Sequence, residues 1–164
     1  YVYSKPWKGV QMSDEYRLIS IPDTRFYHCN IKTLNLIPNV MAAQQASEAG
    51  CNETVFVRDG YVTECSHSNI SMVKDGVFIT HPLDNLILPG TERKHIIRWC
   101  GELGIPVKER AFTLEELYTA DEILVTSTSH PSMRAMELNQ KAVGMKNPEL
   151  IQKLRDKYLN EIGK

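Results

Sequence analysis

The most informative stretch of this sequence reads Ile31-Lys32-Thr33-Leu34-Asn35-Leu36-Ile37-Pro38-Asn39-Val40. Proline suits the first turn of a helix, where its missing N–H needs no partner. We therefore expect a helix from about Ile37 that stops at Gly50. Lys32, just before it, is either an ordinary surface charge or an amine prepared for covalent chemistry. In the second case we expect partial burial beside an extended segment, because burial favours the neutral, nucleophilic amine.

A second stretch, Val62-Thr63-Glu64-Cys65-Ser66-His67-Ser68-Asn69, combines one carboxylate with a run of small hydrogen-bonding residues. Glu64 is either a solvated glutamate at the end of a strand or the carboxylate of a binding site. The polar residues after it either leave backbone amides free for a ligand or form a plain turn.

Two further segments could hold an anion. In Ile87-Leu88-Pro89-Gly90-Thr91-Glu92-Arg93 a glycine precedes an expected helix, whose first N–H groups and dipole favour a negative charge such as a phosphate. Glu92 would compete with that anion, since an acid in a first helical turn is itself favoured by the dipole. The cluster Thr126-Ser127-Thr128-Ser129 follows an apolar strand and is either a ligand-binding strand end or a simple loop.

The rest of the chain alternates hairpins, strands and helices. Asp59-Gly60 and Asp75-Gly76 separate pairs of apolar runs, and Asp-Gly is the strongest local signal for a hairpin. Thr113 and Glu116 match a capping box at the start of a short helix. The other expected elements are extended segments over 10–21, 105–110, 122–126 and 133–138, a helix over about 91–103 that Gly104 ends, and a last helix from Pro148 whose apolar stripe ends at Ile162. The class is therefore α+β.

Composition is that of an ordinary globular domain. The 164 residues are 42% hydrophobic and 24% charged, with a formal net charge of −1. That charge gives no reason to expect nucleic acid or an anionic membrane as partner, and no apolar run approaches the roughly 20 residues that cross a bilayer. Four scattered cysteines fit reduced thiols in the cytoplasm. A metal site from His28, Cys29, Cys65 and His67 is an alternative that lacks the usual ligand spacing.

Taken together, these segments resemble the fold-type IV (class IV) pyridoxal-phosphate-dependent aminotransferases, most closely the D-amino acid aminotransferases. The resemblance extends from about Lys8 to the last helix. It is densest in Ile31–Leu36, Val62–Glu64, Ser66 with Ser68-Asn69, Thr80-His81-Pro82 with Asn85–Leu88, and Val125–Thr128. It implies the C-terminal domain of that fold, a mixed sheet or pseudo-barrel with hairpins and flanking helices.

The resemblance also implies roles for single residues. Lys32 would form the Schiff base with pyridoxal 5′-phosphate and move a proton, and Glu64 would pair with the pyridine nitrogen. Leu88 would pack on the ring, while the amides of Thr91 and Glu92 and the Thr128 hydroxyl would hold the phosphate. Three places depart from the family pattern: a Gly-Ile-Thr-Arg-like turn reads Gly90-Thr91-Glu92-Arg93, Cys65 and His67 replace smaller residues, and His130-Pro131 alters the loop after the hydroxyl cluster.

The expected domain organisation is a linker end over residues 1–9 and a cofactor-binding domain over residues 10–164. The smaller N-terminal domain of the family has no counterpart here, so we expect a longer parent protein or a shortened one. The resemblance implies amino transfer between an amino acid, such as D-alanine, and a 2-oxo acid, such as 2-oxoglutarate, by a homodimer. A branched-chain aminotransferase, an aminodeoxychorismate lyase and a non-catalytic remnant remain open alternatives.

Overall fold

The computed structural model describes residues 12–161, and within them the α+β class is confirmed. The strands are β1 (Met12–Pro22), β2 (Glu53–Arg58), β3 (Tyr61–Cys65), β4 (Asn69–Lys74), β5 (Val77–Thr80), β6 (Val107–Glu109), β7 (Phe112–Thr113), β8 (Glu122–Ser127), β9 (His130–Leu138) and β10 (Lys141–Ala142). The helices are α1 (Ile37–Glu48), α2 (Thr91–Glu102), α3 (Leu114–Tyr118) and α4 (Pro148–Glu161). The predicted linker end, Val10 and Ile162 lie outside the described residues.

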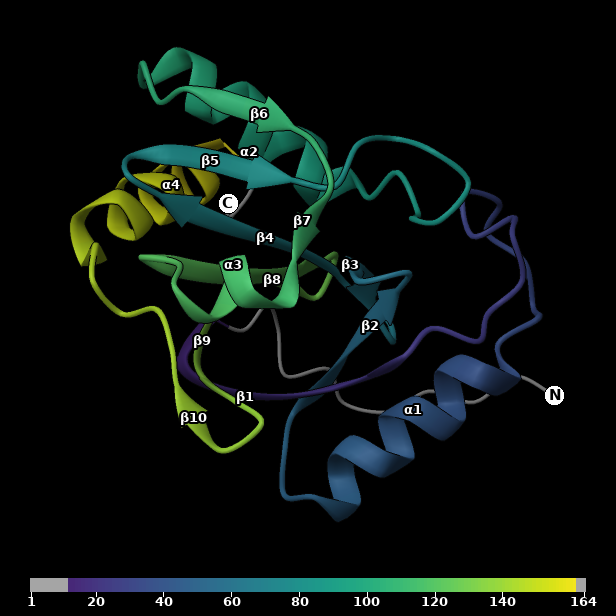
Figure 1. The fold of residues 1–164 in the computed structure, drawn as a ribbon. Helices are drawn as coiled ribbons and strands as arrows, with labels where there is room; N and C mark the ends of the chain where they lie inside the picture. Colours follow the sequence, from purple (N-terminus) through teal and green to yellow (C-terminus); the bar gives the residue numbers. More distant parts are fainter. Residues whose placement is uncertain (1–11, 162–164) are drawn as a thin grey trace, which may run out of the picture.

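All the described strands belong to one mixed sheet. Its order is β6-β5-β4-β8-β9-β1-β2-β3-β7, with β10 paired to β9. Strand β1 lies between β9 and β2 and runs parallel to both, whereas most other neighbours are antiparallel. Figure 1 shows that the sheet is strongly curled, with β2 and β3 turned away from the β4–β5–β8 layer.

The two predicted hairpins are confirmed, between β2 and β3 and between β4 and β5. Asp59 and Gly60 have φ values of 51° and 83°, and Asp75 and Gly76 have 50° and 73°. Positive φ at both central residues is the geometry that Asp-Gly supplies at low cost.

Local signals also set the helix ends. Gly50 and Gly104 adopt positive φ, at 69° each, just after α1 and α2, as helix C-termini favour. The predicted capping box of α3 is present, because Thr113 Oγ1 accepts from the Glu116 amide and the Glu116 carboxylate accepts from the Thr113 amide. In the part of the chain that the structure describes, no helix is long and apolar enough to cross a membrane.

Two apolar clusters fill the faces of the sheet. One lies inside the curl and includes Leu18, Val55, Met72 and Ile123. The other joins α2 and α4 to the outer side of β4, β5 and β8, around Trp99. Figure 1 shows these two helices together, while α1 lies at the opposite end beside β1 and β2.

Candidate functional site

The candidate site begins at the end of β3, where Glu64 is nearly fully buried. One carboxylate oxygen, Oε1, accepts a hydrogen bond from Arg25. The other, Oε2, accepts from the Leu88 amide at 2.8 Å and from Asn69 Nδ2 at 3.2 Å. Burial raises the pKa of Glu64, while Arg25 and the Leu88 amide oppose that rise. Glu64 is therefore a fixed, buried carboxylate in contact with the turn before α2, and the solvated alternative is excluded.

Asn69 connects this carboxylate to the start of α2. Its Nδ2 also donates to the Leu88 carbonyl at 2.9 Å. The backbone of Gly90 approaches so closely that an added Cβ would lie 2.0 Å from Asn69 Oδ1. Only glycine fits this contact, and it brings the first turn of α2 against β4.

Arg25 is the residue that holds Glu64 from the other side. Its guanidinium is buried, donates to Asp23 Oδ2 at 2.9 Å and to the Leu86 carbonyl at 3.1 Å, and stacks 4.3 Å from the Phe56 ring centroid. The carboxylates of Asp23 and Glu64 raise the Arg25 pKa although burial opposes them. The result is a buried network of charged side chains behind the candidate site.

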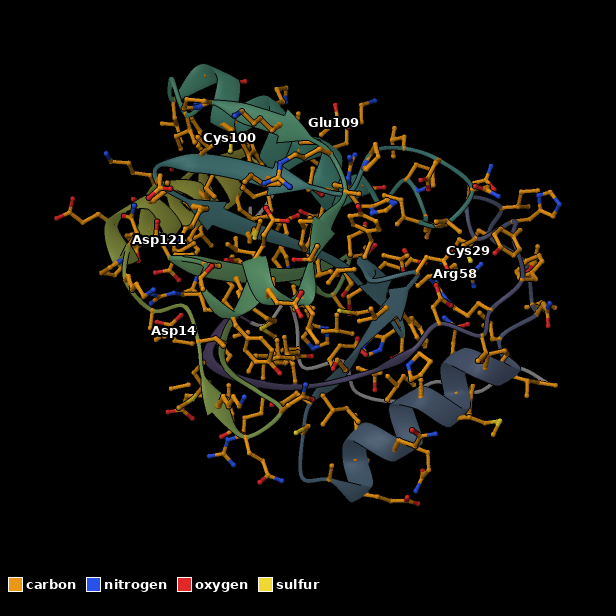
Figure 2. All side chains as sticks on the ribbon, viewed as in Figure 1. Asp14, Cys29, Arg58, Cys100, Glu109 and Asp121 are labelled. Atoms are coloured by element: carbon orange, nitrogen blue, oxygen red, sulfur yellow. The ribbon has the colours of Figure 1, made fainter. Side chains whose placement is uncertain are left out.

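The same network anchors the loop that carries Lys32. Arg58 donates to the Arg25 carbonyl at 2.6 Å and lies 4.4 Å from the Tyr27 ring centroid. Figure 2 labels Arg58 and Cys29 close together where this loop passes β2. Burial raises the pKa of the Cys29 thiol. The Cys29 amide then bonds the Asn85 carbonyl at 2.9 Å, which ties the loop to the segment before Leu88.

Lys32 itself is exposed, and its side chain makes no hydrogen bond or ion pair with another described residue. Within residues 12–161, the partial burial expected for a lysine prepared for covalent chemistry is not found. The lysine lies on the loop between two anchors, the Cys29–Asn85 bond and the bond from Asn39 Nδ2 to the Ser66 carbonyl at 2.7 Å. Nothing within residues 12–161 covers it.

The other predicted residues lie before α2, in its first turn and just after β8. Leu88 is half-buried, Thr91 is exposed at the first position of α2, and Glu92 is buried. The Glu92 pKa is raised by burial, and its Oε2 has no hydrogen-bond partner among the described residues. Thr128 is exposed just after β8, two residues beyond Thr126, which pairs with Asn69.

The polar run after Glu64 is a turn. The Ser66 amide donates to the Thr54 carbonyl at 3.1 Å, and the Cys65 amide donates to the Ser68 carbonyl at 2.8 Å. The possibility that these amides are free for a ligand is therefore wrong for Ser66. Across the described residues, no three His, Cys, Asp or Glu side chains converge as a metal site would require.

Sequence reasoning overlooked two residues of this site. Arg25 is separated from Glu64 by 39 positions, and no local pattern marks the pairing. Asn69 belongs to the polar run after Glu64, and the signal that could have found its role is Gly90 before a helix, which indicates a close backbone approach.

A family model and curated relatives of this chain indicate the same family. A family model described as amino-transferase class IV matches residues 1–138. The D-alanine aminotransferase of Listeria monocytogenes serotype 4b (strain F2365) is 42% identical over 147 residues, which are 88% of this chain and 50% of that protein. The D-alanine aminotransferase of Bacillus licheniformis is 37% identical over 151 residues, 89% of this chain and 53% of that protein. The chain thus spans about half the length of these curated relatives.

Solved structures agree on the fold. A putative 4-amino-4-deoxychorismate lyase from Legionella pneumophila superposes with a TM-score of 0.83 at 25% identity, covering 98% of this chain and 59% of that one. A branched-chain amino acid aminotransferase from Thermobaculum terrenum superposes with a TM-score of 0.78 at 26% identity, covering 87% of this chain and 49% of that one.

Proposed function

The chain belongs to the class IV aminotransferases, and from that membership we propose that it is the pyridoxal-phosphate-binding part of an enzyme that moves an amino group from an amino acid to a 2-oxo acid. One observation carries the proposal. Glu64 is a buried carboxylate held against the Leu88 amide, directly before the first turn of α2. A fixed carboxylate beside a helix N-terminus suits a ligand with a basic ring nitrogen and a phosphate.

The residues around Glu64 and the start of α2 fit such a cofactor. A carboxylate offers about four acceptor positions, so Glu64 can accept one more bond besides those from Arg25, Leu88 and Asn69. The first N–H groups of α2 have no partners inside the helix, and the Thr128 hydroxyl is exposed just after β8. Burial raises the pKa of Glu92, which is the direction that lessens the repulsion between its carboxylate and a phosphate.

Each predicted residue would then have a task at the cofactor. When bound, the cofactor supplies an electron-withdrawing ring for the substrate Cα. Glu64 would keep the ring nitrogen protonated, and Leu88 would pack against the ring face. The amides of Thr91 and Glu92 and the Thr128 hydroxyl would hold the phosphate. Lys32 would bond covalently to the cofactor and carry a proton on Nζ to and from the substrate.

For the substrates, we favour D-alanine and 2-oxoglutarate. The support is the name D-alanine aminotransferase carried by the two relatives at 42% and 37% identity, together with the Lys32-Thr33-Leu34-Asn35 run. The branched-chain and aminodeoxychorismate lyase alternatives rest on structures of lower identity. We also propose a cytoplasmic location, because the four free cysteines would stay reduced there.

The decisive experiment is to incubate the purified chain with pyridoxal phosphate, reduce with borohydride and map the modified peptide by mass spectrometry. We expect the label on Lys32 and its loss in Lys32→Ala. Lys153→Ala, which removes an exposed lysine of α4, is the matched control and should keep the label. Label that persists on the Lys32→Ala protein, or that spreads over many lysines, would favour the non-catalytic remnant.

A further inference from the structure

Glu53, the first residue of β2, is a fully buried carboxylate to which the proposed mechanism gives no task. Its Oε1 accepts from the Thr54 amide at 2.9 Å, from the Ser66 amide at 3.2 Å and from the Ser66 hydroxyl. Its Oε2 accepts from the Ser68 hydroxyl at 3.1 Å. A buried charge is tolerated only when it is paired and hydrogen-bonded, and here nearly all the donors come from one turn.

The charge partner of Glu53 comes from the same turn. His67 Nδ1 lies 2.7 Å from Glu53 Oε2, and the His67 side chain is 53% exposed while that of Glu53 is fully buried. The Ser66 hydroxyl lies 3.1 Å from the same nitrogen. Three consecutive residues of the turn, from Ser66 to Ser68, therefore converge on a single carboxylate.

This turn joins the two residues that define the candidate site. Glu64 precedes it at the end of β3, and Asn69 follows it at the start of β4. Asn69 bonds Glu64 and the Leu88 carbonyl. The position of the turn thus sets how the Glu64 carboxylate and the Leu88–Gly90 segment meet.

We propose that Glu53 is a positioning residue of the cofactor site, and that its ion pair with protonated His67 holds the Ser66–Ser68 turn so that Glu64 and Asn69 stay in register with Leu88. The proposal rests on the proposed function for the identity of the ligand.

The charges around the pair set its response to pH. From β1, Tyr16 faces Glu53, and burial followed by the Glu53 charge raises the Tyr16 pKa to about 12. From β3, burial and then Glu53 raise the pKa of the Cys65 thiol. From β9, the pKa of His130 is lowered by burial and then by the charge of His67. Neither Tyr16 nor Cys65 is charged near neutral pH, so His67 is the counter-ion of Glu53.

The direction of the pH effect follows. The hydrogen bond to Glu53 raises the His67 pKa. The stabilisation of the turn by protonated His67 is therefore complete below about pH 6.5 and is lost as pH rises through the raised pKa. Burial would raise the Glu53 pKa, but the bond and charge of His67 outweigh it and lower that pKa. The stabilisation of the turn by ionised Glu53 is complete above about pH 4.3 and is lost as pH falls through the lowered Glu53 pKa. The turn is therefore held best in mildly acidic to neutral solution.

The test follows the amide resonances of Glu64 and Asn69 by NMR from pH 5 to pH 9 in the cofactor-free protein. We expect both to titrate with His67 in the wild type, to lose that titration in His67→Gln, and to titrate at a lower pH in Glu53→Gln, where the carboxylate that raises the His67 pKa is gone. His130→Gln, which removes the neighbouring imidazole, should retain the titration. Since His67 is half-exposed, His67→Gln should fold and decide the matter even if Glu53→Gln does not.

A second readout is the dissociation constant of pyridoxal phosphate, measured by absorbance titration. Relative to the wild type at pH 6.5, we expect Glu53→Gln to weaken binding by roughly 5- to 30-fold, as for loss of one partner in a buried charged hydrogen bond. The proposal is overturned if the two amides titrate identically in wild type and His67→Gln. A wild type that shows the titration but binds no cofactor would instead count against the proposed function alone.

Discussion

At the scale of single residues, Arg25 is the group on which the site depends most. Its guanidinium compensates two buried carboxylates, those of Asp23 and Glu64. We expect Arg25→Met to lower the free energy of unfolding by roughly 3–5 kcal/mol, because breaking a buried pair leaves uncompensated charge. Urea unfolding measures this loss. The control is Arg98→Met, which removes an exposed arginine that pairs with Glu102 and Glu161. Its urea midpoint should barely move. Equal losses of unfolding free energy in the two variants would contradict the prediction.

Gly90 makes a second prediction at this scale, because an added Cβ would lie 2.0 Å from Asn69 Oδ1. Gly90→Ala should destabilise the protein by roughly 1–3 kcal/mol through overpacking. In Gly101→Ala the new Cβ meets nothing within 4 Å, so this helical position should gain roughly 0.5–1 kcal/mol instead. Thermal and urea unfolding of both variants would show opposite signs. Adding Asn69→Ala to Gly90→Ala should recover part of the loss, and strict additivity would argue against the clash.

At the scale of elements, the short helix α3 depends on its cap. Thr113 Oγ1 accepts from the Glu116 amide at 3.2 Å, and Leu117, one residue later, is fully buried. Thr113→Ala should cost about 1 kcal/mol of unfolding free energy. Thr119→Ala alters the exposed hydroxyl at the other end of α3, which only donates to the Glu116 carbonyl, and should cost less. A larger loss in the Thr119 variant would mean that the N-terminal cap does not stabilise the helix.

Helix α1 shows how one element can carry two different faces. Ala42 and Ala46 are buried against the sheet, whereas Ile37, Val40 and Met41 are 72%, 63% and 59% exposed. Positions three and four apart share a helix face, so these three form one apolar surface. The preceding loop extends it with Ile31 and with Leu34, which is 95% exposed.

At the scale of the whole molecule, this apolar surface beside Lys32 leads us to propose a homodimer. Exposed apolar patches of this kind mark interaction sites. We expect the chain to self-associate at micromolar concentration in sedimentation velocity, and Ile37→Glu to shift it toward monomer. Leu159→Glu places the same charge on an exposed apolar residue of α4, 51% exposed, and should leave association unchanged. A wild type that stays monomeric at every concentration would contradict the proposal.

Much of the fold was predictable because its signals are local. The Asp-Gly hairpins, the glycines after α1 and α2 and the capping box of α3 each depend on residues a few positions apart, and the structure confirms all of them. The resemblance to class IV aminotransferases was likewise carried by short segments in a fixed order, and the family model matches residues 1–138. Sequence alone thus determined the fold class and the family.

Only the tertiary structure decided how the site is built. Arg25 reaches Glu64, His67 reaches Glu53, and Gly90 closes on Asn69 because the folded sheet brings together segments that are apart in the sequence. No spacing rule encodes such contacts, since they depend on sheet order and on the direction of each side chain. The exposure of Lys32 has the same origin: burial is a property of what packs over a residue, and the loop around this lysine has no cover within the described chain.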